Sequence, residues 1–191
     1  YMYGDRVMEG VEGQVDRALL RALKVKNLTE NSRRAFKVYQ KGERYVFEST
    51  WRRRQLRASI PVSAVPSKRA LINIRKALYL LLRAGLQGKV IIWTGEKFDE
   101  QGVIGTHTFL ETYGGERKHI IELRAQKISR AFQLQTLIHE LIHGLQVDVL
   151  GPDQFDKMYR AYNLGLGYAK NPFEEQATNW SYKITKRILN L

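Results

Sequence analysis

The stretch SRAFQLQTLIHELIHGLQVDVL, residues 129–150, decides how the rest of this 191-residue chain is interpreted. Its apolar residues recur at helical spacing and predict a helix with one apolar side. At about 100° per residue, His139 and His143 fall on the opposite side of that helix. We therefore expect two imidazoles that lie one above the other, away from the core face. The apolar residues are Leu134, Leu137, Ile138, Leu141, Ile142 and Leu145.

His139, Glu140 and His143 form the pattern HExxH, which is typical of a metal site. Histidines four residues apart can both reach one metal ion, while the residue after the first points about 100° away. Glu140 is thus placed to act as a general base on metal-bound water. The alternative is a solvated helix face with two exposed histidines. A chance match in a chain of this size has odds of roughly one in several hundred, which favours the metal site.

A catalytic zinc site usually has three protein ligands, so a third ligand is expected. A histidine six residues after the second one is excluded, because Val149 stands there and Gln146 occupies the preceding glycine position of that pattern. The other two histidines, His107 and His119, precede the motif. A carboxylate is then expected, and the downstream candidates are Asp148, Asp153, Asp156, Glu174 and Glu175.

The last predicted helix begins at NPFEEQA, with Asn171 as N-cap and Pro172 in the first turn. Glu174 lies about 80° from the centre of its apolar face, whereas Glu175 lies about 180° away and faces water. Glu174 could instead bond back to the cap as the glutamate of a capping box. We favour Glu174 as the third ligand, with Asp148 as the main competitor.

TLIHELIHGLQ (136–146) followed by NPFEEQATNW (171–180) resembles the zincin metallopeptidases of the gluzincin type. The second stretch is similar to the ExxA pattern of several small bacterial and phage-type families in that group. The first stretch also resembles the SprT-like DNA-associated proteases, which use a third downstream histidine that this chain lacks. The likeness covers about residues 118–190.

This resemblance implies a zinc-dependent endopeptidase with one zinc ion held by His139, His143 and Glu174. It implies that Glu140 activates the zinc-bound water to attack a peptide carbonyl. It also implies an edge strand that pairs with substrate, for which KHIIELR (118–124) is the candidate, although an ordinary buried strand fits those residues equally well. Candidates for the group that stabilises the oxyanion are Tyr159, Tyr162, Tyr168 and His119.

The other patterns predict an α+β fold. The resemblance implies that this fold is zincin-like, with a small antiparallel or mixed sheet packed on the active-site helix and a C-terminal helix that carries the third ligand. A basic appendage, residues 1–60, should precede a metallopeptidase domain, residues 61–191, with the boundary in the proline-containing segment 52–67. Further helices are expected at 7–22, from Thr29 or Asn31 through Tyr39, from a cap at Ser67 to Gly85 or Gly88, and at 153–162. Strands are expected at 44–51, 89–95, 106–114 and 118–124. A loop is expected at 163–172.

Charge is concentrated in the first half of the chain, because residues 1–100 supply +11 of the net +13. Between Arg33 and Arg57 there are nine basic residues, including the run WRRR (51–54), with aromatic residues interleaved. This composition suits a nucleic acid or an acidic protein partner, although a solvated basic surface has the same composition. The alternative function is therefore a nucleic-acid- or assembly-binding protein in which the zincin fold is structural or inactive.

Composition limits the remaining classes of protein. The longest apolar run, ALYLLL (77–82), is far too short to span a bilayer, and the first ten residues lack the features of a secretory signal. The chain has no cysteine, which excludes disulfides and thiolate metal ligands. We expect a cytoplasmic or otherwise intracellular protein that acts on a protein or peptide substrate.

Overall fold

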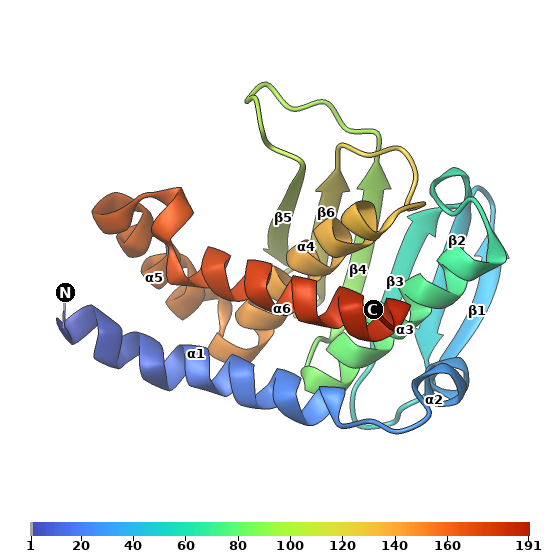
Figure 1. The fold of residues 1–191 in the computed structure, drawn as a ribbon, viewed down its shortest axis with the longest axis horizontal. Coiled ribbons are helices and arrows are strands. Elements are labelled where there is room, and N and C mark those ends of the chain that lie inside the picture. Colours follow the sequence, from blue (N-terminus) through green and yellow to red (C-terminus); the bar gives the residue numbers. More distant parts are fainter. Residues whose placement is uncertain (1) are drawn as a thin grey trace.

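A six-stranded mixed sheet lies at the centre of the fold (Figure 1). The computed structural model describes residues 2–191, with side chains described from Gly13 onward. The strand order is β1-β2-β3-β4-β6-β5. Strands β1 to β3 form an antiparallel meander, β3, β4 and β6 run parallel, and β5 and β6 form an antiparallel hairpin. The strands are β1 (Phe36–Lys41), β2 (Arg44–Ser49), β3 (Leu56–Pro61), β4 (Gly88–Thr94), β5 (Gly105–Glu111) and β6 (Arg117–Leu123).

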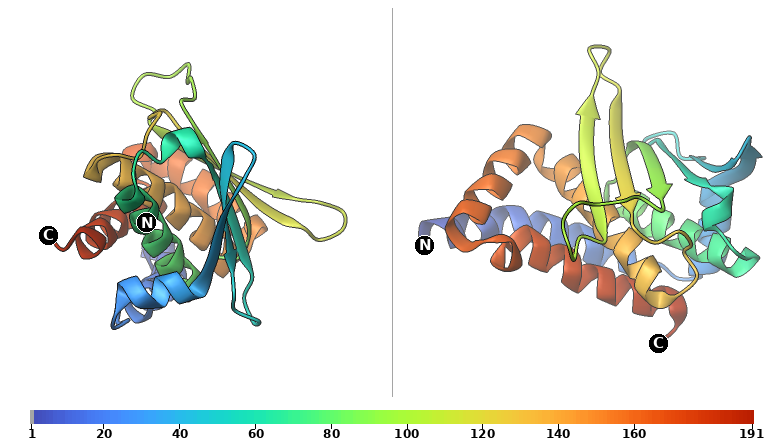
Figure 2. Two further views of the ribbon diagram at one scale, coloured as in Figure 1. Left: turned by 90° about the vertical axis from the view of Figure 1, so that its right-hand side faces the viewer. Right: turned by 90° about the horizontal axis from the view of Figure 1, so that it is seen from above.

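Helices cover one face of this sheet, as the left view of Figure 2 shows. Over the described residues there are six α-helices, which confirms the α+β class. None of them is long and apolar enough to cross a bilayer. The helices are α1 (Met2–Leu23), α2 (Leu28–Ala35), α3 (Lys68–Ala84), α4 (Ala131–Leu150), α5 (Pro152–Leu166) and α6 (Pro172–Leu189), with short 3₁₀ turns η1 (Val62–Ala64) and η2 (Tyr168–Lys170).

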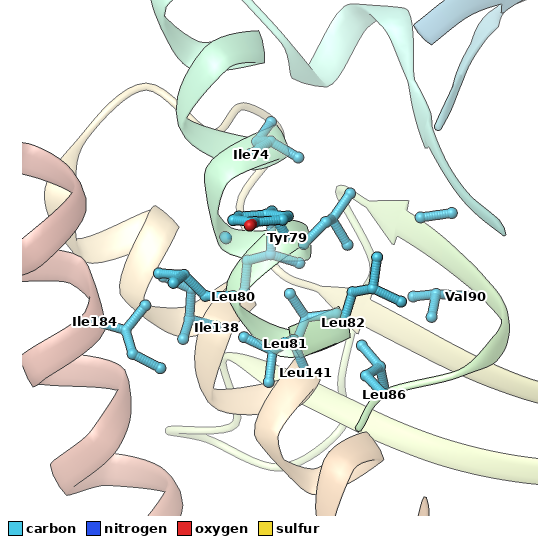
Figure 3. Close-up of a cluster of buried hydrophobic side chains, with 14 of the residues drawn as sticks. Ile74, Tyr79, Leu80, Leu81, Leu82, Leu86, Val90, Ile138, Leu141 and Ile184 are labelled. Carbon is cyan, nitrogen blue, oxygen red and sulfur yellow. The ribbon is translucent and has the colours of Figure 1, made fainter. Parts of the chain in front are cut away.

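The core lies between the sheet and helices α3, α4 and α6 (Figure 3). Helix α3 brings fully buried leucines against Ile138 and Leu141 of α4 and Ile184 of α6. Its ends are those predicted, because the Ser67 hydroxyl accepts a hydrogen bond from the Ala70 N–H and Gly85 closes the last turn with φ 132°. Strand residues alternate, so that Val90 and Ile92 of β4 face the helices.

Two strands were not predicted from the sequence. The helix expected through Tyr39 ends at Ala35, and Phe36 begins β1, which pairs with β2 along its whole length. Pairing in the sheet here overrides a local pattern that also fits a helix. The segment 52–67 contains β3, an interior strand whose Leu56, Ala58 and Ile60 are buried.

The sheet and the core continue across the boundary expected at residues 60 and 61. β3 pairs with β4 on the far side of that boundary, and α1 packs on α3 and α6. On α1, Val15, Ala18, Leu19 and Ala22 lie within the helix predicted at 7–22 and enter the main core. The side chains of Val7 and Val11, at the start of that predicted helix, lie outside the described residues. The first 60 residues therefore build half of the same sheet.

Candidate metal centre

Helix α4 is buried on nearly all sides instead of having one apolar side. Its apolar residues face the core as predicted, but Glu140, His143 and Gln146 are buried as well. The histidine side is covered by α6, which makes extensive contact with α4 along its length. His139 and His143 therefore do not face open solvent, and their side chains are only 18% and 8% exposed.

His139, His143 and Glu174 converge, so that one nitrogen or oxygen atom from each lies within 4.8 Å of the others. The two Nε2 atoms are 3.2 Å apart. Glu174 Oε1 lies 2.9 Å from His139 Nε2, and Glu174 Oε2 lies 2.9 Å from His143 Nε2. Bonds of about 2.0–2.2 Å in a tetrahedral zinc site separate ligand atoms by roughly 3.3 Å. The two imidazoles and the carboxylate therefore fit one such ion.

Glu174 reaches the histidines from the first turn of α6. The Asn171 side chain accepts the Phe173 N–H and starts this helix as predicted. Glu174 does not return to the cap, because its carboxylate bonds to the two histidines and accepts hydrogen bonds from the Tyr159 and Tyr168 hydroxyls at 2.6 and 2.9 Å. The capping-box alternative is therefore wrong for this residue. Glu175 is exposed, as expected.

Gln146 fixes the orientation and the proton of His143. Its amide nitrogen donates to the carbonyl oxygen of Phe173 at 3.0 Å, which leaves the amide oxygen 2.8 Å from His143 Nδ1. Because that oxygen can only accept, Nδ1 must carry a proton, and the Nε2 lone pair of a neutral His143 points at the cluster. Support of this kind is typical of metal-binding histidines.

A chain of hydrogen bonds extends this support to the N-terminal helix. The Gln146 amide also donates to Gln176 Oε1 at 3.0 Å, and Gln176 donates to Asp16 Oδ1 on α1 at 3.0 Å. Trp180 donates its indole N–H to the same oxygen at 2.6 Å. Three helices thus hold the imidazole of His143. The sequence analysis treated Gln146 only as a departure from a pattern, although its position three residues after His143 on the same helix face is a usable signal.

Each ionisable group of the cluster changes the pKa of its neighbours. Burial lowers the pKa of His143, but its hydrogen bond and charge interaction with Glu174 outweigh this and raise the pKa to about 9. Burial opposes ionisation of Glu174, yet hydrogen bonds from both histidines hold its pKa well below the usual range. Burial followed by the Glu174 carboxylate raises the pKa of Tyr159 and of Tyr168, so both hydroxyls remain donors. A proton on His143 Nε2 and a metal ion would compete for the same lone pair.

Glu140 is a buried carboxylate beside this cluster. It is only 6% exposed, and no hydrogen bond to its carboxylate is found among the described side chains and backbone. Burial raises its pKa, with the nearby histidines acting in the opposite direction. A Cβ atom on Gly105 would lie 3.2 Å from its Oε1, so the first residue of β5 passes directly over it. A buried carboxylate with a raised pKa beside possible metal ligands is typical of a catalytic base.

Asp148 belongs to a different buried network. It bonds to Arg117 at 2.8 Å, to His119 Nε2 at 3.0 Å and to the Gln87 N–H at 3.0 Å. His119 Nδ1 continues the chain to His107 Nε2 at 2.9 Å. The structure therefore places Asp148 away from the histidine pair, and His119 is committed to this network. Asp153 and Asp156 lie on α5 and do not join the cluster of His139, His143 and Glu174.

His107 links this network to the candidate metal centre. Its ring lies 6.5 Å from that of His143, measured between centroids. Burial, followed by the neighbouring His119 and His143, holds the pKa of His107 well below its usual value. The network joins β5, β6 and α4 and so helps to set the distance between β5 and α4. No motif in the sequence indicated it.

The edge strand beside the site is β5 and not β6. The predicted edge, residues 118–124, forms β6, which lies between β4 and β5 in the sheet. Gly105, His107 and Phe109 of β5 are registered opposite Leu123, Ile121 and His119 of β6. Since one face of β6 is buried on α4, these three residues of β5 face the same helix.

No family model, no curated protein and no solved structure matches this chain. The geometry of the candidate site is therefore the basis for any functional conclusion.

Proposed function

We propose that this protein is a zinc-dependent metalloendopeptidase with a zincin-like fold of the gluzincin type. The observation that carries the proposal is the convergence of His139 and His143 from α4 with Glu174 from α6, beside the buried carboxylate of Glu140. In this proposal α4 is the active-site helix, and α6 is the C-terminal helix that carries the third ligand. Two imidazoles and a carboxylate, with room for a further ligand, suit zinc best.

Zinc in this position would polarise a peptide carbonyl and make a water molecule acidic near neutral pH. The Glu140 carboxylate would take a proton from the attacking water while the water oxygen forms a bond to the carbonyl carbon. The same residue would then give that proton to the amine nitrogen as the peptide bond breaks. Burial raises the pKa of Glu140, and this direction suits both steps, because a carboxylate with a raised pKa is a stronger base than an ordinary one.

Substrate would lie along the outer edge of β5. This strand is at the end of the sheet, and its first residue lies against Glu140. An extended peptide could pair with the strand and bring one of its carbonyl groups over the cluster. Among the four oxyanion candidates, Tyr168 suits that role best, because its residue is 63% exposed and its hydroxyl is 2.9 Å from Glu174.

Metal content tests the ligand set. Protein purified without added metal should contain about one zinc ion per chain by mass spectrometry. Glu174→Ala should lose most of it, and the neighbouring Glu175→Ala, which removes an exposed carboxylate from the same helix turn, should retain it. Equal zinc in both variants would exclude Glu174 as a ligand, and zinc-free wild type after incubation with the metal would overturn the proposal.

Turnover tests the catalytic role. A quenched-fluorescent peptide library should be cleaved by wild type and not by Glu140→Gln, while both hold the same amount of zinc. Full cleavage by Glu140→Gln would remove Glu140 from the reaction. Zinc binding without turnover on the library or on whole-proteome digests would favour the alternative, a basic binding protein whose zincin-like fold is structural or inactive.

A further inference from the structure

Three arginines line a cavity of about 320 Å³ that shares no residue with the candidate metal centre. It lies between the ends of α1 and α3 and the connection from β2 to β3. Arg21 comes from α1, Arg83 from α3, and Trp51 and Arg54 from the WRRR run in that connection. Alanines supply the rest of the lining, and no carboxylate is part of it.

Two of the guanidinium groups are held in place by backbone. Arg54 Nη1 donates to the carbonyl oxygens of Leu82 and Arg83 at 2.5 and 3.0 Å. Arg83 Nε donates to the carbonyl oxygen of Ala22 at 3.1 Å. These bonds satisfy carbonyls at the C-terminal ends of α3 and α1, so the negative ends of both helices are neutralised. The two cations are therefore fixed before any ligand arrives, which lowers the entropy lost on binding.

Donors remain available on all three arginines. Within the part of the chain that the structure describes, Nε and Nη2 of Arg54 and Nη1 of Arg83 have no hydrogen-bond partner, and none of the three residues forms a salt bridge. Arg21 is exposed, and no contact of its guanidinium is found there. Three cations around one cavity repel one another, and an anion bound between them would offset that repulsion.

The volume of the cavity and its three guanidinium groups favour a phosphate ester over other anions. Planar guanidinium groups bind phosphate oxygens in pairs, and three of them can satisfy a tetrahedral group from several sides. Trp51 adds an aromatic wall and is held edge-on by Tyr79, with centroids 6.0 Å apart. Indole rings stack on bases. The volume is at the small end of the range for ligand sites, roughly 300–1,000 Å³, and suits one nucleotide.

We propose that this cavity binds the phosphate group of a nucleotide, with Trp51 against the base. The nucleotide is either free or part of a single-stranded nucleic acid, and the phosphate chemistry is the same for both. The site uses Trp51 and Arg54 of the WRRR run, which the proposed peptidase chemistry does not use. It does not depend on the metal centre.

Calorimetry on the full chain tests the proposal with inorganic phosphate, AMP, adenosine and a short 5′-phosphorylated oligonucleotide. Wild type should bind AMP and not adenosine. Arg21→Glu should weaken AMP binding at least tenfold. Arg17→Glu is the matched control, because Arg17 is an exposed arginine of α1 outside the cavity, and it should leave the dissociation constant within twofold. Trp51→Phe should weaken AMP more than inorganic phosphate.

Competition separates the two sources of the ligand. AMP that displaces the oligonucleotide would show that one cavity takes the phosphate from either source, and an oligonucleotide that binds at least tenfold tighter than AMP would identify nucleic acid. If Arg21→Glu and Arg17→Glu weaken AMP binding equally, the effect comes from the general basic charge of the surface, and the proposed site is wrong. Absence of binding by all phosphate probes at millimolar concentration, or binding of acidic peptides alone, would also overturn it.

Discussion

Replacing Gln146 with leucine tests whether the hydrogen-bond network behind His143 prepares it to bind metal. The side chain is fully buried and makes three hydrogen bonds, to His143, Phe173 and Gln176. Leucine has a similar volume and can replace none of them. The change leaves buried polar groups without their partner, each at a cost of about 1–3 kcal/mol, so we expect the metal-free protein to lose about 3 kcal/mol of unfolding free energy.

The effect on zinc should be separate from this loss of stability. Changes to residues that support a metal-binding histidine typically weaken affinity about 10- to 100-fold, or about 1.4–2.7 kcal/mol. We therefore expect Gln146→Leu to bind zinc in that weaker range, measured by competition with a fluorescent chelator at a temperature where both proteins are folded. Urea denaturation of the metal-free proteins gives the stability difference independently.

Gln135→Leu is the matched control, since Gln135 lies on the same helix, is partly exposed and has no hydrogen bond to its side chain among the described residues. It should bind zinc like wild type. A folded Gln146→Leu protein with wild-type zinc affinity would refute the reasoning, because the tautomer of His143 would then not depend on the amide.

Three further predictions concern the surroundings of the site. Asp148→Ala should lower the unfolding free energy by about 3 kcal/mol, because it leaves the Arg117 guanidinium and the buried His119 ring without their acceptor. The folded variant should still bind one zinc ion per chain, and loss of zinc from folded protein would restore Asp148 as a ligand. Gly105→Ala should retain zinc but slow peptide cleavage about tenfold or more, because the new methyl group displaces the Glu140 carboxylate. Unchanged turnover would contradict this prediction and would mean that β5 shifts to make room for the methyl group. In the metal-free protein the raised pKa of His143 contributes stability that is complete below about pH 6.5 and is lost as pH rises through about 9. Urea denaturation between pH 6 and 10 should show a decline on the order of 3 kcal/mol that is much smaller in Glu174→Gln, and parallel curves for the two proteins would contradict it.

Much of the candidate site could be predicted because its signals are local. The histidine spacing, the serine cap of α3 and the asparagine cap of α6 each depend on a few neighbouring residues. The angular position of Glu174 separated it from Glu175, and the structure brings Glu174 to the histidines. Strands β4, β5 and β6 were also expected close to their observed ranges.

Features that depend on distant pairing could not be predicted in this way. Residues 36–39 were expected to continue a helix, and their pairing with β2 makes them part of a strand. The order of β5 and β6 in the sheet decides which of them is the edge strand. The alternation of apolar and polar residues within each strand does not reveal that order. The hydrogen-bond chain behind His143 runs through Gln146, Gln176 and Asp16, which lie on three helices. The hydrogen bond between Asp148 and His119 likewise joins a helix to a strand.

The hydrogen bond between Gln176 and Asp16 joins residues 160 positions apart, which has a consequence for the order of events during synthesis. A chain that emerges from the ribosome contains the HExxH helix before it contains Glu174 or Gln176. Contacts between such distant residues form late, because the long intervening loop must close first. The partly made chain therefore has both histidines but neither their third partner nor the contact to α1. Peptidase activity of the proposed kind would therefore arise only after α6 has emerged and packed against α4 and α1.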